Sequence, residues 1–191
     1  MKIKKIESLC KNAKRLMIFN ARDVQWISDG RAVYPLYGLP RLTPDNVLTM
    51  FDVPEDKRGK IYVDEKTELP PYLDISDAYP GEKEIAQEKI SFNYYGKTLL
   101  PFRGSQGVIF LDKKYLEPLT DAKHGFTLFE RVFADGRSYV AVKDGMLLSG
   151  IILPDDAASA ELADLLVNVG ELVAVSAENK AVQLSISDEK D

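Results

Sequence analysis

The chain has 191 residues, 45% of them hydrophobic, and a formal net charge of −5 at pH 7. These values predict a globular protein of one domain or two small ones; the acidic balance argues against a protein that coats nucleic acid over its whole surface but permits a local basic face. No apolar run reaches the roughly 18 residues of a membrane helix, and the N-terminus, MKIKKIESLCKNAKR, lacks the apolar stretch of a secretory signal, so we expect a cytoplasmic protein without a membrane partner.

Residues 3–14 are predicted to form an amphipathic helix, because apolar side chains recur with a helical period through residue 17. These apolar residues are Ile6, Leu9, Cys10, Ala13, Leu16 and Met17. The other side is basic, and its cationic residues are Lys4, Lys5, Lys11, Lys14 and Arg15. The single cysteine lies among the apolar residues, where core packing is a more common role than nucleophilic catalysis.

Three strands are expected after this helix, at residues 15–21, 24–28 and 31–38. The second and third surround Asp29-Gly30, a dipeptide that tolerates the positive φ of a tight hairpin turn. Thr43-Pro44 is typical of a helix start, so a short helix is expected over TPDNVLTMF. A short strand is then expected over KIYVDE.

Residues 66–89 contain three prolines and many charged residues. This composition predicts a long surface connection, with one helical turn near residues 82–87. After the connection, SFNYYG and KTLLPFR predict a pair of strands, and VIFLD predicts another strand.

The segment that follows has the same order of elements as the first. We expect a helix at residues 112–121, which Pro118 shortens or kinks. Strands are expected next at residues 126–133, 138–143 and 146–153, with Asp144-Gly145 in the last turn. The chain is expected to end with a helix at 156–169, strands at 172–177 and 181–187, and a frayed tail at 188–191.

A helix followed by antiparallel strands therefore occurs three times, which predicts an internal repeat. The predicted fold class is α+β, with antiparallel sheets and a few helices packed on one side. The expected divisions are a first unit at 1–65, the connection at 66–89, and a second region at 90–187 made of units 110–154 and 155–187.

This repeated unit resembles the DNA sliding clamps, the processivity factors of replicative polymerases. The resemblance rests on three stretches: IESLCKNAKRLMIFNARDVQWISDGRAVYPLYG, GVIFLDKKYLEPL and ELADLLVNVGELVAVSAENKAVQLSI. It implies a non-enzymatic protein that associates weakly with duplex DNA of any sequence. It also implies that the protein tethers a polymerase or another replication protein and forms a homo-oligomer.

In such proteins, helices offer Lys and Arg side chains to phosphates, and the contacts are independent of sequence. The resemblance therefore implies DNA contacts from the basic side of the first helix, and its residues would be Lys4, Lys5, Lys11, Lys14 and Arg15. The second basic patch would contain Lys113, Lys114 and Lys123. The alternative for any one of these helices is a solvated face without a partner.

Signals for an enzyme are weak. His124 is the only histidine and lies in a predicted turn, and no Cys or His cluster has metal-ligand spacing. No phosphate-binding glycine motif occurs, and Asp155-Asp156 is better explained by a helix start than by acid–base chemistry. We therefore predict no catalytic residue, metal or cofactor.

Two alternatives to a clamp stay open. The first is a protein-interaction or structural module without a DNA role. One form of this alternative gives the module a mobile-element origin. The second is a single-strand binder that stacks bases on aromatic residues beside a cation. The aromatic residues weighed for this role are Trp26, Tyr34, Tyr37, Tyr94, Tyr95 and Phe102 with Arg103, although packing in a sheet is their default role.

Overall fold

The computed structural model describes residues 1–21, 23–66, 69–70, 72–121, 125–156, 165, 168–170, 172 and 175. The labelled helices of this part of the chain are α1 (Ile3–Ala13), α2 (Pro44–Met50), α3 (Glu55–Arg58) and the 3-10 helices η1 (Lys113–Tyr115) and η2 (Glu117–Leu119), and the described positions 165, 168–170, 172 and 175 are helical too. The strands are β1 (Arg15–Ala21), β2 (Val24–Ser28), β3 (Ala32–Pro35), β4 (Tyr62–Lys66), β5 (Lys83–Ile85), β6 (Phe92–Tyr94), β7 (Lys97–Gly104), β8 (Gly107–Asp112), β9 (Thr127–Val132), β10 (Ser138–Asp144) and β11 (Leu147–Ile152).

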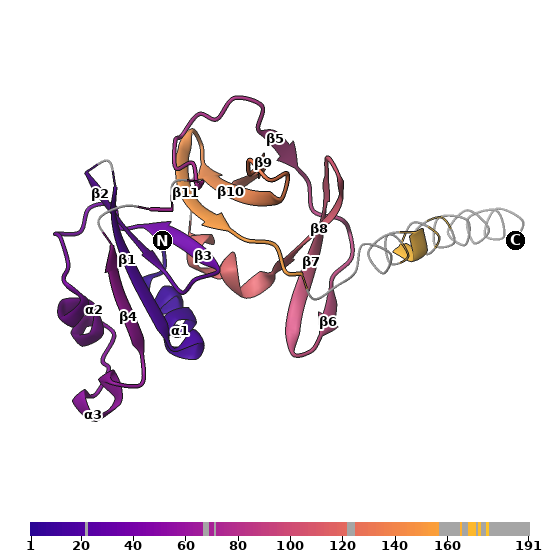
Figure 1. Cartoon of the computed structure of the whole chain (residues 1–191). Coiled ribbons are helices and arrows are strands. Elements are labelled where there is room, and N and C mark those ends of the chain that lie inside the picture. The colour runs from indigo at the N-terminus through magenta and orange to yellow at the C-terminus, as the bar shows by residue number, and fades with distance from the viewer. Residues whose placement is uncertain are drawn as a thin grey trace, which may run out of the picture.

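The fold is α+β, as predicted, and the described residues form two sheets (Figure 1). The larger has eight strands in the order β4-β1-β2-β3-β11-β10-β9-β5, and the smaller has three in the order β6-β7-β8. Antiparallel pairing dominates, but β4 pairs with β1 in parallel. The parallel pair follows from the crossover through α2 and α3, which returns the chain to the edge of the sheet in its original direction.

The centre of the large sheet is the antiparallel pair formed by β3 and β11, where Ile151 lies opposite Val33 and Ile152 opposite Ala32. Each of these strands closes a hairpin with the strand before it, β2 or β10. The strands expected at residues 1–65 and 110–154 therefore share one sheet.

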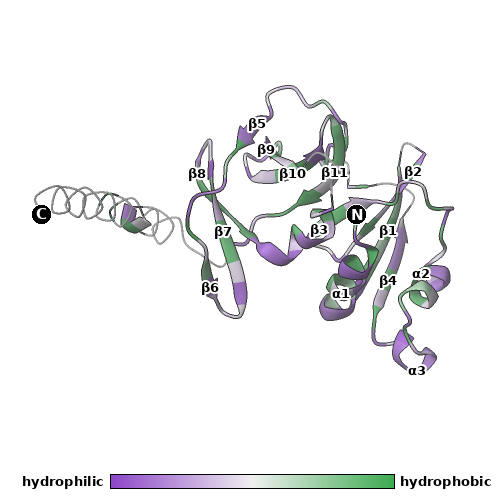
Figure 2. Cartoon of the chain, turned by 180° about the vertical axis from the view of Figure 1, so that it is seen from behind, coloured by the Kyte–Doolittle hydropathy of each residue, from purple (hydrophilic) through white to green (hydrophobic). Residues whose placement is uncertain are grey.

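Side chains alternate between the two faces of this sheet, as strand geometry requires. On one side, which we call the helix face, Leu16 and Ile18 of β1 pack with the buried residues of α1, α2, η1 and η2 in one cluster. On the other, which we call the strap face, Met17 and Phe19 pack with Trp26. The buried residues of α1, α2, η1 and η2 therefore belong to one cluster, whereas α3 has no buried residue. Figure 2 shows that α1 is both apolar and hydrophilic, whereas α3 is hydrophilic.

The predicted surface connection is in large part a packed segment. Its described residues 69–70 and 72–82, which we call the strap, cover the strap face, and Leu69 is buried there while Leu73 and Ile75 pack against the same cluster. The helical turn expected near residues 82–87 is wrong. The chain forms β5 instead, which pairs with β9 and buries Ile85.

The helix expected at residues 112–121 divides into η1 and η2, and Pro118 lies inside η2. Asp112 caps η1, because its carboxylate accepts a hydrogen bond from the N–H of Lys114 at 3.2 Å. The strand expected at 172–177 is wrong where the structure describes it, since Leu172 and Val175 are helical. The strand expected at 181–187 and the tail at 188–191 lie outside the described residues.

No helix in the described part of the chain is long and apolar enough to cross a membrane.

Candidate nucleic-acid interface

The two basic segments lie side by side on the helix face. The backbone N–H of Lys2 donates to the carbonyl of Pro118 at 2.7 Å, and the ammonium of Lys5 pairs with Glu117 at 2.7 Å. The Lys2 ammonium also donates to the hydroxyl of Thr120 at 2.6 Å. The start of α1 is therefore fastened to η2, and its lysines come to the same side of the sheet as those of η1.

Four of the predicted residues lie on α1 or at its end. Lys4 and Lys5 are exposed, and Lys11 is half-buried and pairs with Glu7 at 2.6 Å, one turn earlier in the helix. Lys14 caps the C-terminus with a left-handed backbone, at φ 51°. This cap ends the helix and turns the next residue into β1.

Arg15 does not lie on the helix, which corrects the expected basic stripe. It is the first residue of β1, and alternation places its side chain with Met17 and Phe19 on the strap face. Its guanidinium lies 5.7 Å from the centre of the Tyr62 ring. The helical period seen in the sequence continues past the point where the backbone changes, so it assigned Arg15 to the wrong face.

The structure describes two of the three lysines predicted for the second patch. Lys113 and Lys114 are exposed on η1, and Lys114 pairs with Asp112 at 2.9 Å and lies over the Tyr115 ring at 4.9 Å. Lys123 lies outside the described residues. Across both patches, Lys4, Lys14 and Lys113 have no ion pair with any residue that the structure describes, so their charges are available to an anionic partner.

A buried polar cluster holds η1 against the turn between β2 and β3. The Asp29 carboxylate accepts hydrogen bonds from the N–H groups of Arg31 at 2.9 Å and Ala32 at 3.0 Å, and its charge acts on the phenol of Tyr115 in η1. The hydroxyl of Tyr34 donates to the Tyr115 carbonyl at 2.8 Å. Burial and then the Asp29 charge raise the pKa of Tyr115. Sequence reasoning found the turn but missed this cluster, because it joins residues about 80 positions apart.

Comparison with known proteins gives no relative that would support the clamp resemblance. No family model, curated protein or solved structure matches the chain. Function must therefore be argued from the residues themselves.

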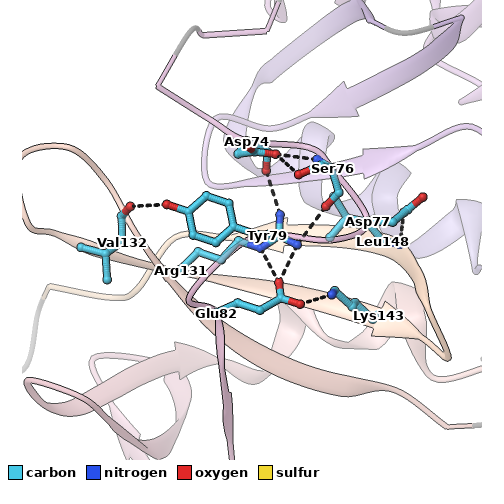
Figure 3. A network of polar contacts seen from close by, with 9 residues as sticks. All are labelled: Asp74, Ser76, Asp77, Tyr79, Glu82, Arg131, Val132, Lys143 and Leu148. Carbon is cyan, nitrogen blue, oxygen red and sulfur yellow. Dashed lines mark hydrogen bonds and ion pairs between the residues drawn. The ribbon is translucent and has the colours of Figure 1, made fainter.

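A second polar cluster lies beneath the strap (Figure 3). Arg131 of β9 is fully buried and donates to Glu82 and to the carbonyls of Asp74 and Ser76. Lys143 of β10 also binds Glu82. These contacts fix the strap to the sheet, and every guanidinium nitrogen of Arg131 has a partner. The arrangement is structural, since its cations are already neutralised or bonded.

Chemistry for an enzyme is not evident in the described residues. No group of three His, Cys, Asp or Glu side chains among them could hold a metal, and His124 lies outside that part of the chain. Cys10 is buried, and burial followed by the charge of Asp29 raises the pKa of its thiol, which opposes a nucleophilic role. The aromatic residues Trp26, Tyr34 and Phe102 are buried, in agreement with a packing role, whereas Tyr95 is 86% exposed.

Proposed function

We propose that this protein is a non-enzymatic, clamp-like DNA-associated protein whose helix face contacts duplex DNA without reading its sequence. The observation that carries the proposal is the fastening of α1 to η2 on one face, through the Lys5–Glu117 pair at 2.7 Å and the Lys2–Pro118 backbone bond. It brings lysines from two segments that are about 110 residues apart in the sequence to one surface. In this role the protein would tether a polymerase or another replication protein.

The order of strands supports the proposal. Outward from the pair at the centre, the sheet continues β3, β2, β1 in one direction and β11, β10, β9 in the other. Each half follows a helix or 3-10 helices that pack on the same face. Two copies of one helix-then-strands unit would produce this order if they met edge to edge.

The charges fit contacts that are weak and sensitive to salt. Lys4, Lys14 and Lys113 are available, whereas Lys5, Lys11 and Lys114 are held in ion pairs. The Lys5–Glu117 pair is exposed on both sides and contributes about 1 kcal/mol or less, so a phosphate can replace its carboxylate. Asp112 is buried, so Lys114, whose side chain is 47% exposed, would keep that pair while it contacts a phosphate. With three to six phosphate contacts, the logarithm of the association constant should fall with the logarithm of salt concentration with a slope of about −3 to −5.

The test is the binding of a labelled duplex at low salt, measured by fluorescence anisotropy. The double variant Lys4→Glu/Lys113→Glu should weaken binding about tenfold or more and make the salt dependence less steep. The matched control is Lys89→Glu/Arg103→Glu, which makes the same change in net charge at exposed residues beside the three-stranded sheet. Equal loss in both variants, or no duplex binding by the wild type, would contradict the proposal.

A protein-interaction module without a DNA role is the second candidate, and one observation favours it. Four large apolar residues of the C-terminal segment are helical and 46–70% exposed: Leu165, Val169, Leu172 and Val175. Exposed apolar residues at helical positions are typical of a surface that meets another protein. If light scattering shows a stable oligomer and the anisotropy assay shows no duplex binding, this candidate is the better one.

A further inference from the structure

A row of arginines crosses the end of the large sheet, and neither the duplex-binding surface nor the strap cluster uses it. Arg15 begins β1, Arg31 follows the turn after β2, and Arg137 lies in the turn between β9 and β10. Neighbouring strands in a sheet are about 4.8 Å apart, so the strand order places the outer two about 20 Å from each other. We call these three residues the arginine row.

Two connected clefts lie along the row. One has a volume of about 160 Å³ and is lined by Arg15, Arg31, Tyr72 and Leu153 among others. The other has a volume of about 420 Å³ and is lined by Arg31, Arg137, Phe133 and Leu153 among others. They share Arg31 and Leu153, so the surface continues from one end of the row to the other.

Aromatic rings accompany the cations at both ends. The Tyr62 ring, 60% exposed, lies 5.7 Å from the Arg15 guanidinium. At the other end, Tyr72 is 63% exposed and packs edge-on against Phe133 at 5.6 Å, while the Arg137 guanidinium lies 5.8 Å from the Phe133 ring. Exposed tyrosines therefore stand where the row begins and where it ends.

Four carboxylates lie beside the larger cleft, and each has a partner of its own. Arg31 meets Asp156 at 3.8 Å, and that carboxylate is 90% exposed; Arg137 pairs with the exposed Asp135 at 2.8 Å. Both pairs are open to solvent and contribute little. The other two carboxylates of the larger cleft are engaged, because Asp155 pairs with Lys97 at 2.6 Å and Glu130 accepts hydrogen bonds from Ser138 and Ser105. Arg15 has no ion pair with any described residue.

We propose that the arginine row with Tyr62 and Tyr72 binds a single-stranded nucleic acid. Guanidinium groups suit backbone phosphates, and exposed rings stack on bases whose faces are open only in a single strand. A row of about 20 Å matches a strand of several nucleotides better than one isolated phosphate. This site is separate from the duplex contacts proposed for the helix face and does not depend on them.

The test uses a labelled oligo(dT) of roughly 12 nucleotides, a length within the range of single-strand sites, in about 50 mM salt, where phosphate contacts are strong. The variant Arg15→Glu/Arg137→Glu changes two exposed side chains and should weaken binding about tenfold or more. Tyr72→Ala should weaken it on the order of tenfold, while Tyr72→Phe, which keeps the ring, should retain it. Circular dichroism verifies that each variant is folded.

Two matched variants locate the site. Lys89→Glu/Arg103→Glu has the same change in net charge and should leave oligo(dT) affinity within about twofold, since it removes no contact of the row. Lys4→Glu/Lys113→Glu alters the helix face and should weaken oligo(dT) binding less than Arg15→Glu/Arg137→Glu does. The proposal is overturned if the wild type does not bind oligo(dT), or if either matched variant weakens binding as much as Arg15→Glu/Arg137→Glu. It is also overturned if a duplex binds the row as tightly, or if polyglutamate competes as well as unlabelled oligo(dT), which would indicate an acidic protein partner.

Discussion

Glu82 of the strap and Arg131 of β9 form an ion pair in which the cation is fully buried. The Nε of Arg131 donates to Glu82 at 2.9 Å, and its Nη2 lies 2.7 Å from the same carboxylate oxygen. The other carboxylate oxygen accepts from Lys143, whose side chain is 6% exposed. One carboxylate therefore balances part of the charge of two buried cations, which lie 49 and 61 residues away in the sequence.

The substitution Glu82→Gln should lower the free energy of unfolding by about 3–5 kcal/mol, because it leaves two buried cations without their anion. Urea unfolding followed by circular dichroism measures the loss. The matched control is Glu117→Gln, which breaks the Lys5–Glu117 pair at the same distance of 2.7 Å, but on the surface. The control should lose about 1 kcal/mol or less. Equal losses in the two variants would contradict the assigned role of Glu82.

The two Asp-Gly turns, which are alike in sequence, should respond differently to loss of the aspartate. Asp29 is buried and accepts two backbone hydrogen bonds, so Asp29→Ala should destabilise the protein by about 1–3 kcal/mol. The Oδ1 of Asp144 is buried and accepts no hydrogen bond from the described residues, so Asp144→Ala should change stability by about 0.5 kcal/mol or less. Thermal unfolding of both variants measures the contrast, and a larger loss from Asp144→Ala would refute it.

Local signals predicted much of the fold. The periodicity and turn residues of the first 28 positions place α1, β1 and β2 within one residue of their ends. The Asp-Gly turns are predicted correctly because the positive φ at Gly30 and Gly145 is a local requirement of a tight turn. The burial of Ile6 and Leu9 follows from the same helical period that predicted α1.

What the sequence could not show depends on distant partners. The pairing of β5 with β9 and the burial of Arg131 are decided by residues about 45 to 60 positions away, and Arg131 itself reads as an ordinary polar residue of a strand. For the candidate site, the lysines of α1 were found from local periodicity, but Arg15 was placed on the wrong face. The sequence predicted the change from helix to strand at residues 14 and 15, but the helical period of the side chains was followed through residue 17, past the left-handed Lys14 that ends the helix.

Stability at acidic pH should depend on Glu130. Burial acts to raise its pKa, but hydrogen bonds from Ser138 at 2.5 Å and from the Ser105 N–H at 2.7 Å outweigh burial, so the net shift of the pKa is downward. A carboxyl whose pKa is lowered in the folded state stabilises the protein at pH values above its ordinary pKa of about 4.3. This contribution disappears as the pH falls through the folded-state pKa.

Glu130→Gln should therefore make the protein less stable near neutral pH and reduce the decline in stability as pH falls below about 4.3. The measurement is the free energy of unfolding by urea from neutral pH to about pH 3, compared with wild type. Glu84→Gln is the control, since Glu84 is exposed. An unchanged pH profile in Glu130→Gln would show that the hydrogen-bonded carboxylate does not contribute.

The Cys10 thiol should be unreactive in the folded protein. Its side chain is 2% exposed and its Sγ donates to the Ser28 carbonyl at 3.9 Å, while burial and the Asp29 charge both raise the pKa of the thiol. Since the thiolate is the reactive form, modification by an aromatic disulfide reagent should follow unfolding, with full reaction in denaturant as the reference. Asp29→Ala should speed the reaction for two reasons. It loosens the cluster around Cys10, and it removes a charge that raises the pKa of the thiol. Rapid stoichiometric modification of wild type with unchanged circular dichroism would refute this assignment.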